Sequence, residues 1–181
     1  NIKTEVLIVG GGMAGILCAF MLKNAGIDCV LVEAKKICDG ITKNTTAKIT
    51  LQHGLLYDKL ITRFGKESAL LYYRAQKAAC EKYAELCADI DCDFEIKDSF
   101  VYSLCNKEKI NKEFLALKHL GADVELCKDI NLPFDVAGAV CVKDQAQFHP
   151  LKFAYAISRK LPIYENTKVL EILPHKVITR H

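Results

Sequence analysis

Three glycines near the start of the chain have a spacing that is typical of phosphate binding. Gly10, Gly12 and Gly15 follow an apolar segment at residues 6–9 in the order G-x-G-x-x-G. Gly10 allows a sharp turn out of a strand, Gly12 lets the backbone approach a pyrophosphate, and Gly15 lets the next helix pack close to a sheet. The spacing therefore predicts a phosphate cradle between a strand and a helix.

The residues after these glycines supply the remaining parts of a dinucleotide-binding βαβ unit. A helix that begins at Met13 and Ala14 presents its free N–H groups and the positive end of its dipole to phosphate. Residues 29–33 form a second strand ending at Glu33, where a carboxylate accepts hydrogen bonds from ribose hydroxyls and repels a 2′-phosphate. Because strand, helix and acid stand where the motif needs them, a dinucleotide site is favoured over a plain strand-to-helix turn.

The composition is typical of a globular protein. The chain has 181 residues, 51% of them hydrophobic, and a net charge of +3. Its lysines and acids are interleaved and form no basic stripe with aromatic residues, which argues against nucleic acid as a partner. Charges interrupt every apolar segment before it reaches the roughly 18 residues of a membrane span, so no span is expected. A signal peptide before the first strand is not expected either.

Nine cysteines form no C-x-x-C pair, and no histidine or cysteine has zinc-ligand spacing. No metal site is therefore expected, although metal binding or a redox pair stays open as an alternative. Most of the cysteines stand in apolar, periodic surroundings, where a free thiol behaves as a small hydrophobic group. We expect reduced thiols and a cytoplasmic protein.

A hydroxyl-rich polar stretch follows Glu33 and extends to residue 50. Its threonines Thr42, Thr45 and Thr46 could cap a helix or contact phosphate oxygens, and beside a nucleotide site neither role is favoured. Periodicity then predicts one or two helices over residues 57–90, a hairpin or bent strand over 94–104, a helix over 108–120, strands over 122–126 and 137–142, a helix starting at 149–150, and short extended pieces over 163–166 and 168–173. This order suggests a sheet domain inserted into the nucleotide domain.

Three segments together resemble the flavin oxidoreductases of the D-amino-acid oxidase and glycine oxidase superfamily. They are the glycine fingerprint, the stretch GITKNTTAKIT and the stretch QAQFHPLKFAYAISRKLPIYENTKVLEI. More narrowly, TTAKITLQHGLLYDKLI resembles a bacterial branch whose members often carry a C-terminal Rieske iron–sulfur domain. The resemblance covers nearly the whole chain. It implies FAD as the cofactor, a small-molecule substrate, and a Rieske iron–sulfur domain as partner in the full-length protein.

The resemblance also implies an α/β fold, with a Rossmann-like FAD-binding βαβ domain and an inserted, incomplete α+β substrate domain. The expected bounds are residues 1–93 and 145–181 for the FAD-binding domain and 94–144 for the inserted part. Members of the superfamily are considerably longer than this chain, which starts at Asn1 without a methionine and stops at His181. We therefore expect an N-terminal fragment of a larger enzyme.

The resemblance assigns roles to individual residues. Those implied to bind FAD are Gly10, Gly12, Met13, Ala14 and Gly15 at the pyrophosphate, Glu33 at the adenosine ribose, Ala34 and Lys35 beside the adenosine, Thr42, Thr45, Thr46 and Ala47 at the pyrophosphate and ribityl chain, and the backbone of Val169 at the adenine. Val169 is equally typical of a core strand. Lys48 is implied to lie near the flavin. His53 follows closely enough to approach the flavin ring, but a structural role is favoured for it.

The leading hypothesis for function is an FAD-dependent oxidoreductase, in which hydride passes from an amine or a related small substrate to the flavin; no catalytic residue is identified. The flavin carries the redox chemistry, so the absence of an evident acid–base pair does not count against an enzyme. An NAD-dependent dehydrogenase shares the fingerprint but predicts an uninterrupted second βαβ half. A non-catalytic nucleotide-binding module is the third hypothesis.

Overall fold

The computed structural model describes residues 2–180, so the expected domain limits at Asn1 and His181 lie outside the described residues. The chain forms two compact units. The first comprises the residues up to Ala47, Ile90–Cys92 and the residues from His149 onward, and the second comprises Lys48–Asp89 and Asp93–Phe148.

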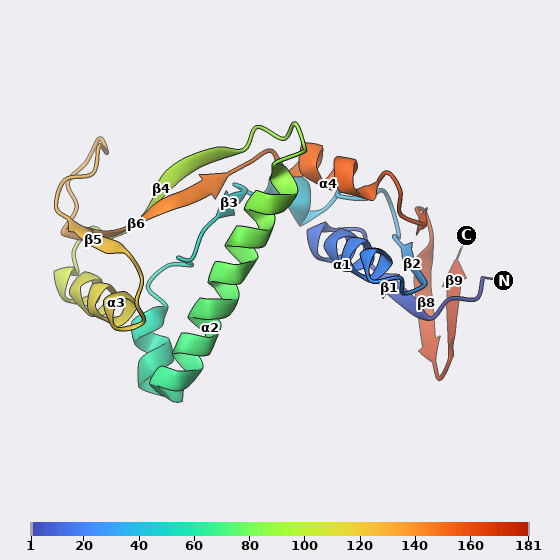
Figure 1. The fold of residues 1–181 in the computed structure, drawn as a ribbon, viewed down its shortest axis with the longest axis horizontal. Coiled ribbons are helices and arrows are strands. Elements are labelled where there is room, and N and C mark those ends of the chain that lie inside the picture. The colour runs from blue at the N-terminus through green and yellow to red at the C-terminus, as the bar shows by residue number, and fades with distance from the viewer. Residues whose placement is uncertain (1, 181) are drawn as a thin grey trace. The chain divides into compact units, whose positions relative to one another are not determined.

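A parallel sheet of three strands forms the centre of the first unit. Strands β1 (Val6–Val9), β2 (Cys29–Val32) and β7 (Ile163–Tyr164) lie in the order β1-β2-β7. All four residues of β2 are buried, as its continuous apolar sequence requires. Helix α1 (Met13–Asn24) contacts β1 and β2, and α4 (Pro150–Ser158) contacts α1 (Figure 1). This unit therefore contains the predicted βαβ arrangement.

Helix α4 begins where its sequence predicts. The Nδ1 atom of His149 accepts a hydrogen bond from the N–H of Lys152 at 3.4 Å, and Pro150 occupies the first turn. His149 is thus a helix-start residue.

A hairpin follows β7. Strands β8 (Lys168–Leu173) and β9 (Lys176–Arg180) pair in antiparallel fashion. The sequence did not indicate β9, because its apolar residues Val177 and Ile178 are adjacent and break the alternation of a half-buried strand.

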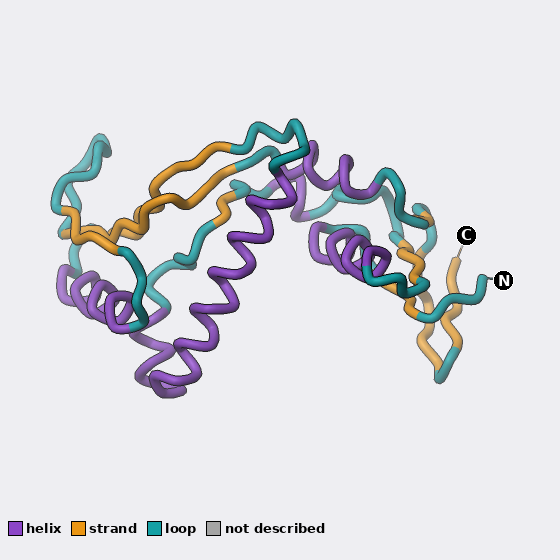
Figure 2. Tube along the Cα trace, viewed as in Figure 1, coloured by secondary structure: helices purple, strands orange, loops and turns teal. Residues whose placement is uncertain are grey.

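An antiparallel sheet forms the second unit. Strands β3 (Lys48–Ile49), β4 (Glu95–Ser103) and β5 (Val124–Cys127) all pair with β6 (Gly138–Gln147). Figure 2 shows β4 and β6 running side by side. Helices α2 (Tyr57–Cys87) and α3 (Lys107–His119) share a hydrophobic core with this sheet. The core contains Tyr57, Tyr73, Leu117, Val124, Val140 and Val142.

Helix α2 is interrupted at one residue. Gly65 has φ 82° and ψ 164°, which is not a helical conformation and is almost exclusive to glycine. The helix therefore consists of two pieces, in keeping with the predicted one or two helices, and it ends at Cys87 rather than Ile90.

The start of α2 is held by a carboxylate from α3. Glu113 is 1% exposed, and its Oε1 accepts hydrogen bonds from the N–H groups of Leu56 and Tyr57, both at 2.9 Å. Its Oε2 accepts from the N–H of Asp58 at 3.0 Å. A helix cannot satisfy its first N–H groups itself, so Glu113 caps α2 from outside. No sequence motif indicated this role.

The expected α/β fold class is confirmed, since a parallel βαβ sheet is joined to an antiparallel sheet. The region 94–104 is the single bent strand β4, which has a bulge between Lys97 and Ser99. Strand β6 continues beyond the expected residue 142 to Gln147, because its polar end pairs with β3 and β4.

The compact units differ from the expected domain limits. Residues 48–89, which include α2, residue 93 and residues 145–148 group with the antiparallel sheet rather than with the first unit. The expected limits concern the functional domains of the whole protein, and they stay a prediction.

Candidate dinucleotide site

Two of the glycines have geometries that only glycine adopts easily. Gly10 has φ +108°, and its N–H donates to the carbonyl oxygen of Val32 at 2.8 Å, so the turn is tied to the end of β2. A Cβ atom at Gly15 would lie 2.0 Å from the carbonyl oxygen of Gly10 and 3.5 Å from Ile8 Cγ2. Helix α1 therefore approaches β1 and the turn too closely for any side chain at this position.

Gly11 and Gly12, in the middle of the turn, differ from each other in how crowded they are. A Cβ atom at Gly12 would meet nothing closer than Thr42 Oγ1, at 3.5 Å, so the protein's own packing does not demand glycine there. Space for a ligand is the physical reason that remains. A Cβ atom at Gly11 would lie 2.7 Å from Ile37 Cγ2 and 3.1 Å from Glu33 Cβ. The G-x-G-x-x-G motif does not indicate this crowded position, because it treats residue 11 as variable.

The N-terminus of α1 is only partly satisfied by the protein. The N–H of Ile16 donates to the carbonyl oxygen of Gly12 at 3.0 Å, and the N–H groups before it have no acceptor within the helix. Thr42, on the short helix η1 (Ile41–Asn44), accepts a hydrogen bond from the N–H of Met13 at 3.1 Å. Thr42 is buried and caps α1, while Ala14 and Gly15 keep N–H groups that suit an anion.

Glu33 stands beside this helix start. Its Oε2 accepts from the N–H of Gly11 at 2.7 Å, and its Oε1 accepts from the N–H of Lys35 at 2.8 Å. The residue is half-buried, and a carboxylate has about four lone-pair sites, so hydroxyl donors can still be accommodated. The site thus joins a positive helix end to a negative carboxylate, which suits pyrophosphate and ribose respectively.

The other residues that the sequence places at or near the cofactor follow Glu33 in the chain. Thr45 and Thr46 are exposed, and Thr45 Oγ1 accepts a local hydrogen bond from the N–H of Ala47 at 3.2 Å. Ala34 and Lys35 follow β2 and are exposed. Val169 is a half-buried residue of β8 paired with Thr179, and Lys48 and His53 belong to the second unit.

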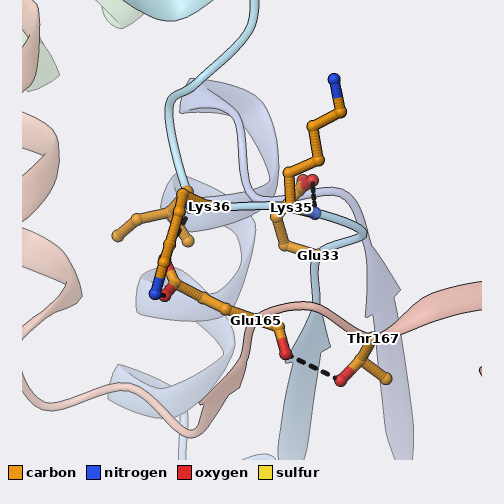
Figure 3. A network of polar contacts seen from close by, with 6 residues as sticks. Glu33, Lys35, Lys36, Glu165 and Thr167 are labelled. Atoms are coloured by element: carbon orange, nitrogen blue, oxygen red, sulfur yellow. Dashed lines mark hydrogen bonds and ion pairs between the residues drawn. The ribbon is translucent and has the colours of Figure 1, made fainter. Parts of the chain in front are cut away.

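A second segment, residues 165–167, completes the surroundings of Glu33 (Figure 3). The carbonyl oxygen of Glu33 accepts from the N–H of Thr167 at 2.8 Å, and that of Lys35 from the N–H of Asn166 at 2.9 Å. The carboxylate of Glu165 contacts Lys36. These contacts cannot be predicted from the sequence, because the partners are far apart in the chain and carry no shared motif.

Among the described residues, no cysteine forms a disulfide bond. Cys38 lies close to the site, where its burial, and secondarily the charge of Glu33, raise the pKa of its thiol. Across residues 2–180, no group of three or more His, Cys, Asp and Glu side chains is placed to hold a metal ion. None of the described helices is long and apolar enough to cross a membrane.

Residues 5–180 match the family described as DAO, FAD dependent oxidoreductase. The chain belongs to this family. A curated relative of this DAO-family chain is the Bacillus subtilis (strain 168) protein called putative Rieske 2Fe-2S iron-sulfur protein YhfW, which is 37% identical over 179 residues. That match covers 94% of this chain and 35% of YhfW.

Solved structures with the DAO-family fold are also similar to this chain. The glycine oxidase from Bacillus cereus ATCC 14579 has a TM-score of 0.72 and 21% identity, covering 98% of this chain and 51% of its own. The L-proline dehydrogenase from P. horikoshii has a TM-score of 0.73 and 18% identity, covering 94% and 46% respectively. These likenesses show the fold, and this chain is partial in length beside all three proteins.

Proposed function

We propose that this chain binds FAD through its first unit, and that the whole protein is an oxidoreductase that removes hydride from an amine or a related small substrate. The observation that carries the proposal is the glycine turn. It joins an incompletely satisfied helix N-terminus, an uncrowded Gly12 and the rim carboxylate of Glu33. Membership of a family of FAD-dependent oxidoreductases supports FAD as the dinucleotide.

Each part of the turn would have its own task in holding FAD. The N–H groups of Gly12, Ala14 and Gly15 would bind the pyrophosphate, and Thr42 would fix the start of α1 through its contact with Met13. Glu33 would accept the ribose hydroxyls. The remaining proposed contacts are those of Ala34, Lys35, Thr45, Thr46, Ala47 and Val169.

Bound FAD would supply the two-electron redox chemistry. The residues of the first unit would orient and retain it, which decides where a substrate can meet it. Glu33 would also favour a dinucleotide with free ribose hydroxyls over one with a 2′-phosphate, because two negative groups would face each other.

The electron acceptor in the whole protein is proposed to be an iron–sulfur centre. The proposal rests on the similarity to YhfW, which is named as a Rieske protein and is far longer than the matched part. The complete gene tests it, because a Rieske domain needs C-x-H and C-x-x-H ligand pairs downstream. A gene without them would exclude this acceptor.

The cofactor proposal is tested by offering FAD, NAD and NADP separately to the purified chain. We expect flavin absorbance to stay with the protein after desalting, and FAD to raise the thermal unfolding temperature. Stabilisation by nicotinamide dinucleotides alone would favour an NAD-dependent dehydrogenase. In the whole protein, bound flavin that neither an amine nor a chemical reductant bleaches would favour a non-catalytic module.

A further inference from the structure

Glu165 lies between β7 and β8 and reaches across to the loop that follows β2 (Figure 3). Its Oε1 accepts a hydrogen bond from the N–H of Ile37 at 2.8 Å. Its Oε2 forms an ion pair with Lys36 Nζ at 2.6 Å. One carboxylate thus holds two successive residues of the loop.

The backbone beside Glu165 strengthens this attachment. The N–H groups of Asn166 and Thr167 donate to the carbonyl oxygens of Lys35 and Glu33, at 2.9 and 2.8 Å. Asn166 has φ 54°, a left-handed conformation that asparagine tolerates better than most residues. The turn at residues 165–167 therefore lies along the whole loop from Glu33 to Ile37.

The loop residues that Glu165 holds pack against the glycine turn. Ile37 stands so close to Gly11 that a Cβ atom there would lie 2.7 Å from Ile37 Cγ2. The N–H of Cys38 donates to the carbonyl oxygen of Gly11 at 2.9 Å, and the N–H of Gly11 donates to Glu33. A continuous series of contacts thus runs from Glu165 through Ile37 and Gly11 to the carboxylate of Glu33.

We propose that Glu165 is a positioning residue of the dinucleotide site, which fixes residues 36–38 against the glycine turn and so sets the shape that receives the adenosine diphosphate part of FAD. This inference rests on the proposed function. The contact with Ile37 is its main element, because a backbone N–H bonded to a carboxylate is a strong hydrogen bond in a fixed place. The Lys36 side chain is 68% exposed, and such pairs contribute little.

The test measures the affinities of ADP and FAD for the wild-type chain and four variants by calorimetric titration. Glu165→Ala removes the contacts with Ile37 and Lys36. It should lower the affinities for ADP and for FAD by the same factor, about tenfold. Glu165→Gln keeps an oxygen that accepts from Ile37 and should stay within about threefold of wild type, as should Lys36→Ala. Glu171→Ala, an exposed glutamate on β8, is the matched control and should leave both affinities unchanged.

A spectroscopic measurement on the wild-type chain keeps the inference testable even if Glu165→Ala does not fold. The amide resonance of Ile37 should move with pH as the Glu165 carboxyl titrates, and this movement should vanish in Glu165→Gln. An unmoved Ile37 resonance, or wild-type ADP and FAD affinities in a folded Glu165→Ala variant, would overturn the inference alone. A wild-type chain that binds neither nucleotide would overturn the proposed function and the inference together.

Discussion

Both compact units place a glutamate carboxylate over backbone N–H groups, but the two carboxylates differ in what surrounds them. Glu113 in the second unit is 1% exposed and accepts from three successive N–H groups at the start of α2. Glu33 in the first unit is half-buried and accepts from two N–H groups at the rim of the glycine turn. The first carboxylate is enclosed by the protein, whereas the second still faces solvent.

The difference separates a structural carboxylate from one that can serve a ligand. A buried ionised group must be fully hydrogen-bonded by its neighbours, so Glu113 has no capacity to exchange partners. Glu33 keeps access to water, and a ribose hydroxyl can replace a water molecule there. Exposure, more than residue type or partner, therefore indicates which glutamate belongs to a site.

The largest expected effect comes from Glu113→Ala. Three N–H groups lose their acceptor at once, so we expect the second unit to lose about 4 kcal/mol of unfolding free energy. Urea unfolding monitored by circular dichroism measures this loss. The FAD affinity of the folded variant should not change. Glu108→Ala, on the exposed side of the same helix, is the control and should cost less than about 0.5 kcal/mol.

Gly15→Ala should be the most damaging change at the dinucleotide site. The new methyl group would lie 2.0 Å from the Gly10 carbonyl oxygen, so the turn or α1 must move. We expect a loss of about 3 kcal/mol in unfolding free energy together with loss of measurable FAD binding. Gly138→Ala on β6 is the control, since its new Cβ atom would come no closer than 3.5 Å to a neighbour, which is ordinary van der Waals contact. Equal behaviour of the two variants would contradict the close-approach argument.

Glu33→Gln tests whether the carboxylate of Glu33 serves ligand binding rather than the stability of the fold. The amide keeps the shape but loses the charge and one of the two acceptor oxygens. FAD affinity should therefore fall about tenfold, whereas the thermal unfolding temperature of the free protein should fall only slightly, because water can reach this half-buried residue. Flavin fluorescence titration and a thermal scan of the same sample measure the two quantities. A large loss of stability without loss of affinity would place Glu33 in the same class as Glu113.

The smallest expected effect is a difference in acid sensitivity at Glu165. The ion pair with Lys36, and then the hydrogen bond from Ile37, hold the pKa of the Glu165 carboxyl below its ordinary value. Such a group stabilises the folded state above its unfolded pKa, near 4.5, and this contribution is lost as pH falls through its folded pKa.

Wild-type stability should therefore fall more steeply than that of Glu165→Gln as the pH drops below about 4.5. The difference should stay below about 1 kcal/mol, because Lys36 is largely exposed. Urea unfolding at a series of acidic pH values measures it, and parallel curves for the two proteins would contradict the assignment.

The sequence predicts the parts of the site that depend on local geometry. Gly10, Gly15 and the start of α1 follow from a short motif, because the turn that needs glycine is made by neighbouring residues. Glu165 and Glu113 could not be predicted in this way. Each acts on backbone groups far from it in the chain, and a lone glutamate has no periodic pattern that names its partner. The sequence predicts an extended piece over residues 163–166, but not that Ile163 and Tyr164 pair with β2.

Gly65 has a consequence for how α2 opens and closes. The non-helical backbone at Gly65 divides α2 into an initial segment, residues 57–64, and a longer one, residues 66–87. Amide hydrogens of the two segments can then exchange with solvent at independent rates, because the helix is not continuous at Gly65 and each segment can open separately. The initial segment is tied to α3 by Glu113, so its protection from exchange should report the integrity of that carboxylate rather than the strength of the helix itself.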